Sequence, residues 1–183
     1  MNKNIFSSVF GSFKRLKTFD IVLLALLIAT NIVLERFLGF VGVSNAYSIS
    51  FLIVAFAAAK YGILGGAVVS GVGDFFGAFF SGGPNICITL VAILLGVFYG
   101  VALNEKMGRY NILKAFLAVL PSQIFCTLFL NTFFICLFYV GLESYWAIFT
   151  GRLVQSLVMT PVQIILIHLF MKMIIPKIKL PSK

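Results

Sequence analysis

The stretch that decides the fold is Ile49–Phe80, ISFLIVAFAAAKYGILGGAVVSGVGDFFGAFF, in which apolar and small residues are interrupted by Lys60-Tyr61-Gly62 and by Asp74. A single helix over these residues would be about 48 Å long, against a hydrocarbon core of about 30 Å, and would place Lys60 near the bilayer centre. Two short helices, Ile49–Tyr61 and Leu64–Phe80, place Lys60 at a water interface instead. The stretch therefore predicts two membrane spans joined by a tight turn.

Four further apolar stretches are long enough to cross a bilayer, which takes roughly 17–25 helical residues. They are Asp20–Phe40, Ile86–Leu103, Ile112–Val140 and Tyr145–Ile175. Hydrophobic residues make up 61% of the 183 residues and charged residues only 10%, a balance that excludes a water-soluble domain. We therefore predict an all-α integral membrane protein, a bundle of six transmembrane helices.

Basic residues mark one side of the predicted bundle. They cluster before the first span, between the fourth and fifth, and at the end of the chain: Lys3, Lys14, Arg15, Lys17, Lys106, Arg109, Lys114, Lys172, Lys177, Lys179 and Lys183. The loops expected on the other side, 41–48, 81–85 and 141–144, carry Glu143 as their only charge. Because basic loops remain in the cytoplasm, both termini are expected there. The chain then divides into a basic N-terminus (1–18), a membrane domain (19–175) and a basic tail (176–183).

The net charge of +9 would suggest nucleic-acid binding in a soluble protein, but here the basic residues flank membrane spans and face anionic lipid. No GxxxxGK[ST], HExxH or GxSxG motif is present, so neither an ATPase nor a hydrolase is predicted. Cys87, Cys126 and Cys136 lie singly in apolar spans and His168 has no companion, which favours packing over metal binding. We expect no metal, no cofactor and no nucleic acid.

Ionisable residues inside spans are the usual indicators of function, because a charge there costs roughly 2.5–3.5 kcal/mol on insertion scales. Glu35 and Arg36 lie near the outer end of the first span, and Arg152 lies in the outer third of the sixth, so they converge at one depth. Asp74 lies mid-span, so it should be either paired or protonated, and Arg152 is its most attractive partner.

These residues indicate either a buried ion pair that holds the bundle together or a pocket for an anionic or polar ligand near the outer leaflet. Arginine suits such a pocket, since it stays charged and can bind a carboxylate bidentately. Further hydrogen-bonding groups come from Asn131, Thr132 and Gln155.

Small residues spaced four apart let helix backbones approach closely in a membrane. The pairs are Ala25 and Ala29, Gly62 and Gly66, Gly73 and Gly77, and Gly96 and Gly100. Packing within the bundle is one interpretation and docking of another membrane subunit is the other. Ala25 and Ala29 are the best docking candidates, because they lie in the cytoplasmic half of the first span.

A series of motifs covers nearly the whole chain in order. They are ALLIATNIVLERFLGF (25–40), SISF (48–51), YGILGGAVVSGVGDFFGAFF (61–80), GVFYG (96–100), LNTFF (130–134) and GRLVQSLVMTPVQ (151–163). In their order and spacing they resemble the substrate-binding S components of energy-coupling factor transporters, and among these the folate family.

The resemblance implies a six-helix bundle in the cell membrane that captures a vitamin, folate first among the candidates, at the outer face. It also implies partners, a transmembrane T component and two cytoplasmic ATPases, which would hydrolyse the ATP. Ala25 and Ala29 match the motif that contacts the T component, and the loop 42–47, which ends at Tyr47, would cover the pocket.

Within the pocket, Arg36, Asn131 and Arg152 match family positions. The full set of expected binding residues is Arg36, Tyr47, Ser50, Asp74, Asn131, Arg152 and Gln155. At two positions where family members often carry arginine, this chain has Ser48 and Leu95. A different vitamin, or a pterin-like or deazapurine-like precursor, is therefore the alternative ligand.

Two other classes of function remain as alternatives. An autonomous proton-coupled transporter would use Asp74, the one well-placed mid-membrane carboxylate, as its coupling site. An integral membrane enzyme would need a catalytic constellation, and the sequence shows none.

Overall fold

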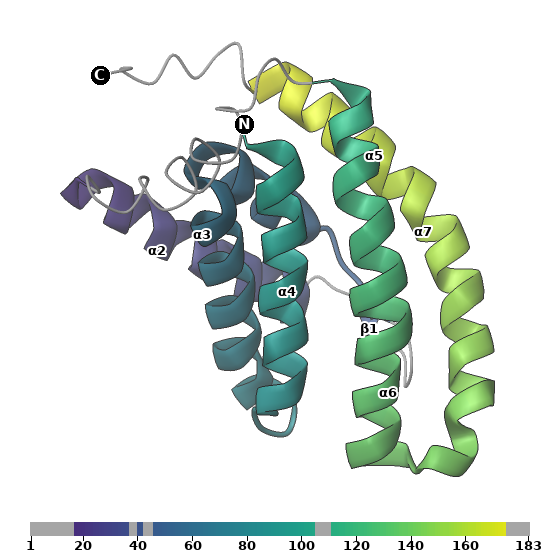
Figure 1. Ribbon diagram of the computed structural model, residues 1–183. Helices are drawn as coiled ribbons and strands as arrows, with labels where there is room; N and C mark the ends of the chain where they lie inside the picture. The colour runs from purple at the N-terminus through teal and green to yellow at the C-terminus, as the bar shows by residue number, and fades with distance from the viewer. Residues whose placement is uncertain (1–16, 37–39, 42–45, 105–110, 175–183) are drawn as a thin grey trace, which may run out of the picture.

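The structure is a computed structural model that describes residues 17–36, 40–41, 46–104 and 111–174 (Figure 1). Its helices are α2 (Thr18–Arg36), α3 (Phe51–Ala78), α4 (Ile86–Leu103), α5 (Ile112–Pro121), α6 (Thr132–Ile135) and α7 (Tyr145–Ile174). Two short strands, β1 (Phe40–Val41) and β2 (Ala46–Tyr47), pair antiparallel between α2 and α3. Five helical segments in the described part are long and apolar enough to cross a membrane. The predicted all-α membrane bundle is confirmed.

Among these five segments, α3 counts as a single helix. The backbone of α3 nevertheless breaks at Gly62, where φ is 71° and ψ is −154°. A Cβ atom added to Gly65 would lie 2.6 Å from the carbonyl oxygen of Ala57. Two residues eight apart in a straight helix are separated by about 12 Å, so the chain turns sharply between them. α3 therefore has two arms, residues 51–61 and 63–78, which correspond to the two short helices predicted from the sequence.

Contacts with α2 show where each arm leads. The Tyr61 hydroxyl donates a hydrogen bond to Asp20 Oδ1 at the start of α2, over 3.1 Å. At the opposite end of α2, Arg36 Nη2 lies 3.4 Å from Asp74 Oδ1 on the second arm. Tyr61, at the end of the first arm, therefore lies beside the start of α2, and Asp74, on the second arm, lies beside the end of α2. We call these the Asp20 end and the Arg36 end of the bundle, and Lys60 lies at the Asp20 end.

The turn at Gly62 gives a first prediction. Its backbone region is one that almost only glycine adopts, and a Cβ there would lie 3.0 Å from Asn104 Nδ2. We expect Gly62→Ala to lower the free energy of unfolding by about 1–3 kcal/mol, measured by thermal unfolding in detergent. Gly151→Ala is the matched control, because a Cβ there meets nothing within 4 Å. If both variants were as stable as the wild type, the chain would not make the tight turn described at Gly62.

Residues Ile112–Val140 form one continuous rod, as predicted, but the rod is not a uniform α-helix. It widens into π-helical turns at Ser122–Asn131 and again at Cys136–Val140. The first widening follows Pro121 directly, and proline has no N–H for the regular helical hydrogen bond. Gln123, which is buried, belongs to this π-helical stretch.

The helices pack in a definite order. α3 contacts both α2 and α4, α4 contacts the rod, and α7 contacts the rod and α3. In Figure 1, α2 (purple) and α7 (yellow-green) lie on opposite sides of the bundle. One apolar cluster joins α3, α4, the rod and α7 and includes Ala59, Leu103, Ala118, Ile167 and Met171. A second joins α2 to α3 and includes Leu27, Val54, Ala57 and Val69.

Three of the four small-residue pairs serve packing inside the bundle. A Cβ on Gly66 or on Gly96 would meet the other's carbonyl oxygen, so these residues bring α3 and α4 into backbone contact. Gly73 and Gly77, one turn apart on the second arm, instead make room for the Asn31 and Arg36 side chains of α2. Gly62 and Gly100 lie at the turn, where a Cβ on Gly100 would meet the backbone of Ile63.

The fourth pair is different, because Ala25 and Ala29 are both exposed on α2. Leu27, between them in sequence, is buried against α3. The two alanines therefore face away from the bundle, together with the exposed side chains of Val22 and Val33. They are not needed for packing within the described chain.

Candidate functional site

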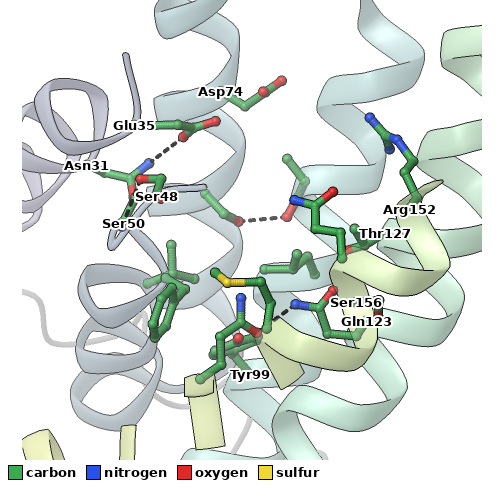
Figure 2. A pocket seen from close by; sticks show the side chains of 18 residues that line it. Asn31, Glu35, Ser48, Ser50, Asp74, Tyr99, Gln123, Thr127, Arg152 and Ser156 are labelled. Carbon is green, nitrogen blue, oxygen red and sulfur yellow. Dashed lines mark hydrogen bonds between the residues drawn. The ribbon is translucent and has the colours of Figure 1, made fainter. Parts of the chain in front are cut away.

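A cavity of about 230 Å³ lies among α2, α3, α4, the rod and α7 (Figure 2). Most of the residues that line it are polar: Asn31, Glu35 and Asp74 lie toward the Arg36 end, and Gln123 and Gln163 lie deeper in the bundle. The apolar cluster that includes Leu103, Ala118 and Met171 packs around Tyr99, another lining residue, and closes the bundle toward the Asp20 end. The polar cavity therefore belongs to the Arg36 half of the bundle.

The wall formed by α2 and α3 carries the two carboxylates of the cavity, Glu35 and Asp74. Arg36 Nη2 lies 3.4 Å from Asp74 Oδ1 and 3.8 Å from Glu35 Oε1, so one guanidinium serves two carboxylates. Thr89 on α4 donates a hydrogen bond to Asp74 Oδ2 over 2.9 Å. Asn31 Nδ2 faces Glu35 Oε2 at 3.5 Å.

The opposite wall is formed by α7 and the π-helical part of the rod. Arg152 lies here and is only 8% exposed, with Gln155 one turn further along α7. In the floor, Gln123 Nε2 donates to Gln163 Oε1 over 2.6 Å and ties the rod to α7. Figure 2 shows Arg152 across the cavity from Glu35. The cavity is thus bordered by carboxylates on one side and by a cation and amides on the other.

Of the residues predicted from the sequence, the structure brings Ser50, Asp74, Arg152 and Gln155 to the cavity lining. Arg36 stands behind this lining as the partner of Asp74. Two predicted residues are placed otherwise. Asn131 lies on the rod, outside the described lining, and its Oδ1 is buried without a hydrogen-bond partner among the described residues. Tyr47 lies in β2, but the structure does not describe its side chain.

The expected pairing of Asp74 with Arg152 is wrong. The structure pairs Asp74 with Arg36, because α2 packs directly against α3 whereas Arg152 approaches from α7 on the far side of the cavity. The depth of each residue was predictable from its position along its span. The identity of the neighbouring helix was not.

Several lining residues were missed as binding groups. They include the carboxylate of Glu35, the amides of Asn31, Gln123 and Gln163, and the hydroxyl groups of Ser70, Thr127 and Ser156. A signal was available, since amides within apolar spans seek hydrogen-bond partners across the bundle just as charged residues do. Ser48 and Leu95, noted as departures from the family pattern, also line the cavity. Both departures therefore lie in the cavity wall.

The described residues contain no group of three or more His, Cys, Asp or Glu placed to hold a metal ion. Cys126 and Cys136 are fully buried, and Cys87 is partly buried; all three are free thiols.

An all-α bundle that spans the membrane and encloses a polar cavity is the architecture of a membrane-embedded transport or binding protein. The model of the family described as "ECF transporter, substrate-specific component" matches residues 19–171, and the chain belongs to this family. It is thus the substrate-specific S component of an ECF transporter, a multi-pass protein of the cell membrane and a transport subunit without catalytic activity. Its partners are its substrate and the ECF module.

Among solved structures, the chain is similar to the "Crystal structure of FolT bound with folic acid", with a TM-score of 0.76 and 23% sequence identity. The match covers 83% of this chain and 92% of that chain. At this identity the likeness establishes a FolT-like fold. No curated protein matches the sequence.

Proposed function

We propose that this S component captures folate or a closely related compound at the outer face of the membrane. The observation that carries the proposal is the polar cavity in the Arg36 half of the bundle, closed by apolar packing toward the Asp20 end. With both termini in the cytoplasm, as the basic clusters indicate, the Arg36 end faces outward. The similarity to FolT, whose structure holds folic acid, supports folate as the first ligand to test.

Delivery inward would follow docking to a transmembrane T component driven by two ATPases. Ala25 and Ala29 are proposed as the docking contact, since they are exposed small residues on the side of α2 that faces away from the bundle. Small side chains permit close backbone approach between helices of different subunits.

Reconstituted uptake tests this proposal. Vesicles that hold the purified chain, a T component and both ATPases are expected to accumulate folate only when ATP is supplied on the side of the ATPases. Vesicles that hold the chain alone should accumulate none. Accumulation by the chain alone under a proton gradient, lost in Asp74→Asn, would contradict the proposal and establish an autonomous proton-coupled transporter.

Arg152 provides a second prediction, because a cation in the cavity wall can pair with an anionic or acceptor group of the ligand. We expect Arg152→Ala to weaken ligand binding at least about 30-fold, which corresponds to about 2 kcal/mol for truncating one partner of a buried pair. The affinity of Arg152→Lys should lie between those of the wild type and Arg152→Ala, since lysine keeps the charge but not the planar guanidinium group. Calorimetric titration measures both.

Lys172→Ala, an exposed cation on the same helix, is the control and should bind normally. Normal affinity in a folded Arg152→Ala variant would remove Arg152 from the ligand site and leave it a structural role.

A second candidate ligand is favoured by one observation. Ser48 and Leu95 line the cavity at the two positions where folate-family members often carry arginine. The cavity therefore has fewer cations to neutralise the two carboxylates of folate's glutamyl tail. Another vitamin, or a pterin-like or deazapurine-like precursor without that tail, is the candidate that this difference favours.

A further inference from the structure

α2 lies both at the proposed docking face and at the cavity. Its exposed side carries Ala25 and Ala29, and the half toward the Arg36 end brings Asn31 and Glu35 into the cavity lining. Yet α2 packs mainly against α3, and Leu27 and Asn31 are its only buried residues in the part of the chain that the structure describes. How α2 is held on α3 therefore decides whether docking can act on the cavity.

At the Asp20 end, polar and aromatic contacts join α2 to α3. Both oxygens of Asp20 are engaged: Oδ1 accepts a hydrogen bond from the Tyr61 hydroxyl over 3.1 Å, and Oδ2 accepts one from the Lys17 backbone N–H over 3.0 Å. Lys60 Nζ lies 5.7 Å from the ring centroid of Phe19 on α2 and 5.0 Å from that of Tyr61 on α3, distances at which a cation is attracted to an aromatic face. We call Phe19, Asp20, Lys60 and Tyr61 the hinge cluster. It fixes the start of α2 to the turn of α3.

Toward the Arg36 end, α2 rests on glycines instead. The Asn31 side chain fits against Gly73, and the Arg36 side chain fits against Gly77. Glycine has no side chain that interlocks with a neighbouring helix, so α2 can slide over this surface without displacing a side chain of α3. Arg36 Nη2 lies 3.4 Å from Asp74 Oδ1, which is longer than a well-formed charged hydrogen bond. The described contacts between α2 and α3 are therefore looser at this end than at the hinge cluster.

The positions along α2 favour a tilt over a uniform shift. At about 1.5 Å per residue, Ala25 and Ala29 lie about 7.5 Å and about 13.5 Å from Asp20, and Glu35 lies about 22 Å from it. If the hinge cluster holds its place, a displacement of about 1 Å at the two alanines becomes about 2 Å at Glu35. A shift of about 2 Å separates groups that lie at hydrogen-bonding distance, because such a bond is lost beyond about 3.5 Å. A small movement at the docking face thus becomes a larger one at the cavity.

We propose that α2 is a lever held at the hinge cluster, and that docking on Ala25 and Ala29 tilts its other end away from α3 and opens the wall of the cavity. This inference rests on the proposed function, from which it takes the docking contact. The hinge cluster stays in place, while the cavity-lining side chains of α2 move. Ser48, whose Oγ donates to the carbonyl oxygen of Leu34 over 3.0 Å, moves with α2. An opened cavity holds its ligand less tightly, so docking and ligand binding oppose each other.

A reversible cross-link between α2 and α3 tests the tilt. A Cβ atom added to Gly73 would lie 3.7 Å from Asn31 Cβ, a separation that a disulfide bridges without strain. In a chain whose own cysteines are replaced by alanine, the double variant Asn31→Cys, Gly73→Cys therefore locks α2 on α3 when oxidised and releases it when reduced. We expect ATP-dependent uptake to fall about tenfold or more on oxidation and to return with reductant. Comparing two states of one variant separates the cross-link from any effect of the substitutions on the cavity.

The matched control joins α3 to α4. A Cβ atom added to Gly71 would also lie 3.7 Å from Ile93 Cβ, and neither residue belongs to α2 or lines the cavity. The oxidised Gly71→Cys, Ile93→Cys variant should therefore transport as well as its reduced form. Co-purification with the T component is measured for both double variants. We expect oxidation to leave it unchanged, because Ala25 and Ala29 remain exposed.

Tyr61→Phe tests the hinge cluster from outside the cavity. The substitution removes the hydroxyl that bonds to Asp20 and keeps the aromatic ring beside Lys60. Without a fixed point, docking shifts α2 as a whole and displaces its far end less. We expect uptake to fall about threefold or more, while the isolated chain keeps its ligand affinity. Tyr139→Phe, at an exposed tyrosine on the rod, is the control and should transport normally.

Undiminished uptake by the oxidised Asn31→Cys, Gly73→Cys variant would show that α2 stays on α3 during transport and would overturn the lever. Loss of co-purification on oxidation would overturn it as well, because the cross-link would then act on docking itself. Normal uptake by Tyr61→Phe would overturn the hinge cluster as the fixed point. In all three cases the wild type still transports. If the wild type showed no ATP-dependent uptake, the proposed function itself would fail, so the two failures are distinguishable.

Discussion

Replacing both Ala25 and Ala29 with leucine is expected to abolish uptake while the purified chain binds its ligand with unchanged affinity. Both alanines are exposed on the side of α2 that faces away from α3 and lie outside the cavity lining. Leucine at these positions therefore fits the isolated bundle but holds a docking helix away from the α2 backbone. In the reconstituted system, we expect ATP-dependent uptake to fall at least tenfold, to the level without ATPases.

Ala147→Leu is the matched control for this pair. Ala147 is also an exposed alanine, but it lies on α7, at the opposite side of the bundle from α2 (Figure 1). Uptake by this variant should be normal. A loss of ligand affinity in the Ala25 and Ala29 double variant would mean that the pair supports the bundle itself, and normal uptake would mean that the T component docks elsewhere.

Gly96→Val should have the largest effect on the folded bundle. A Cβ at Gly96 would overlap the carbonyl oxygen of Gly66 and the Ser70 hydroxyl, so α3 and α4 could not keep their backbone contact. Overpacking a core costs about 1–3 kcal/mol when side chains can move, and here one obstacle is backbone. We expect a lower yield of monodisperse protein, a lower thermal midpoint and loss of ligand binding.

Gly151→Val controls for placing a β-branched residue in a helix, because a Cβ at Gly151 meets nothing within 4 Å. Size-exclusion profiles and thermal unfolding in detergent compare the two variants. If Gly96→Val were as stable as Gly151→Val, then α3 and α4 would not be in backbone contact.

The helices could be predicted almost completely, because membrane spans follow from length and apolarity alone. The turn at Gly62 was predictable as well, since Lys60 would otherwise lie near the bilayer centre. The first span was predicted to extend to Phe40, but the helix as described covers Thr18–Arg36, and Phe40 belongs to β1. Apolar composition alone does not distinguish the last turn of a helix from a following strand.

The site was predictable only in part. Charge and polarity within the spans identified Asp74 and Arg152 as candidates, and position along each span placed them at nearby depths. The rotation of each helix and the order of packing are not encoded in such a pattern. For that reason the partner of Asp74 was misassigned, and the place of Asn31 in the cavity lining, packed against Gly73, was not predicted.

The π-helical stretch was likewise beyond prediction, although Pro121 indicates where a regular helix is interrupted. Gln123 lies in this stretch and closes the floor of the cavity with Gln163. This pair joins segments 40 residues apart in sequence, and such long-range pairs follow from packing rather than local pattern.

The central claim is that this chain by itself captures a small molecule from solution. Calorimetric titration of the purified, detergent-solubilised protein, without T component or ATPases, against folate and a panel of other vitamins and pterin-like compounds tests it most directly. Calorimetry is preferable to fluorescence because Trp146 is 72% exposed and does not line the cavity. We predict saturable binding of one compound, folate first, at one molecule per chain. A folded chain that bound no compound in the panel would contradict the account.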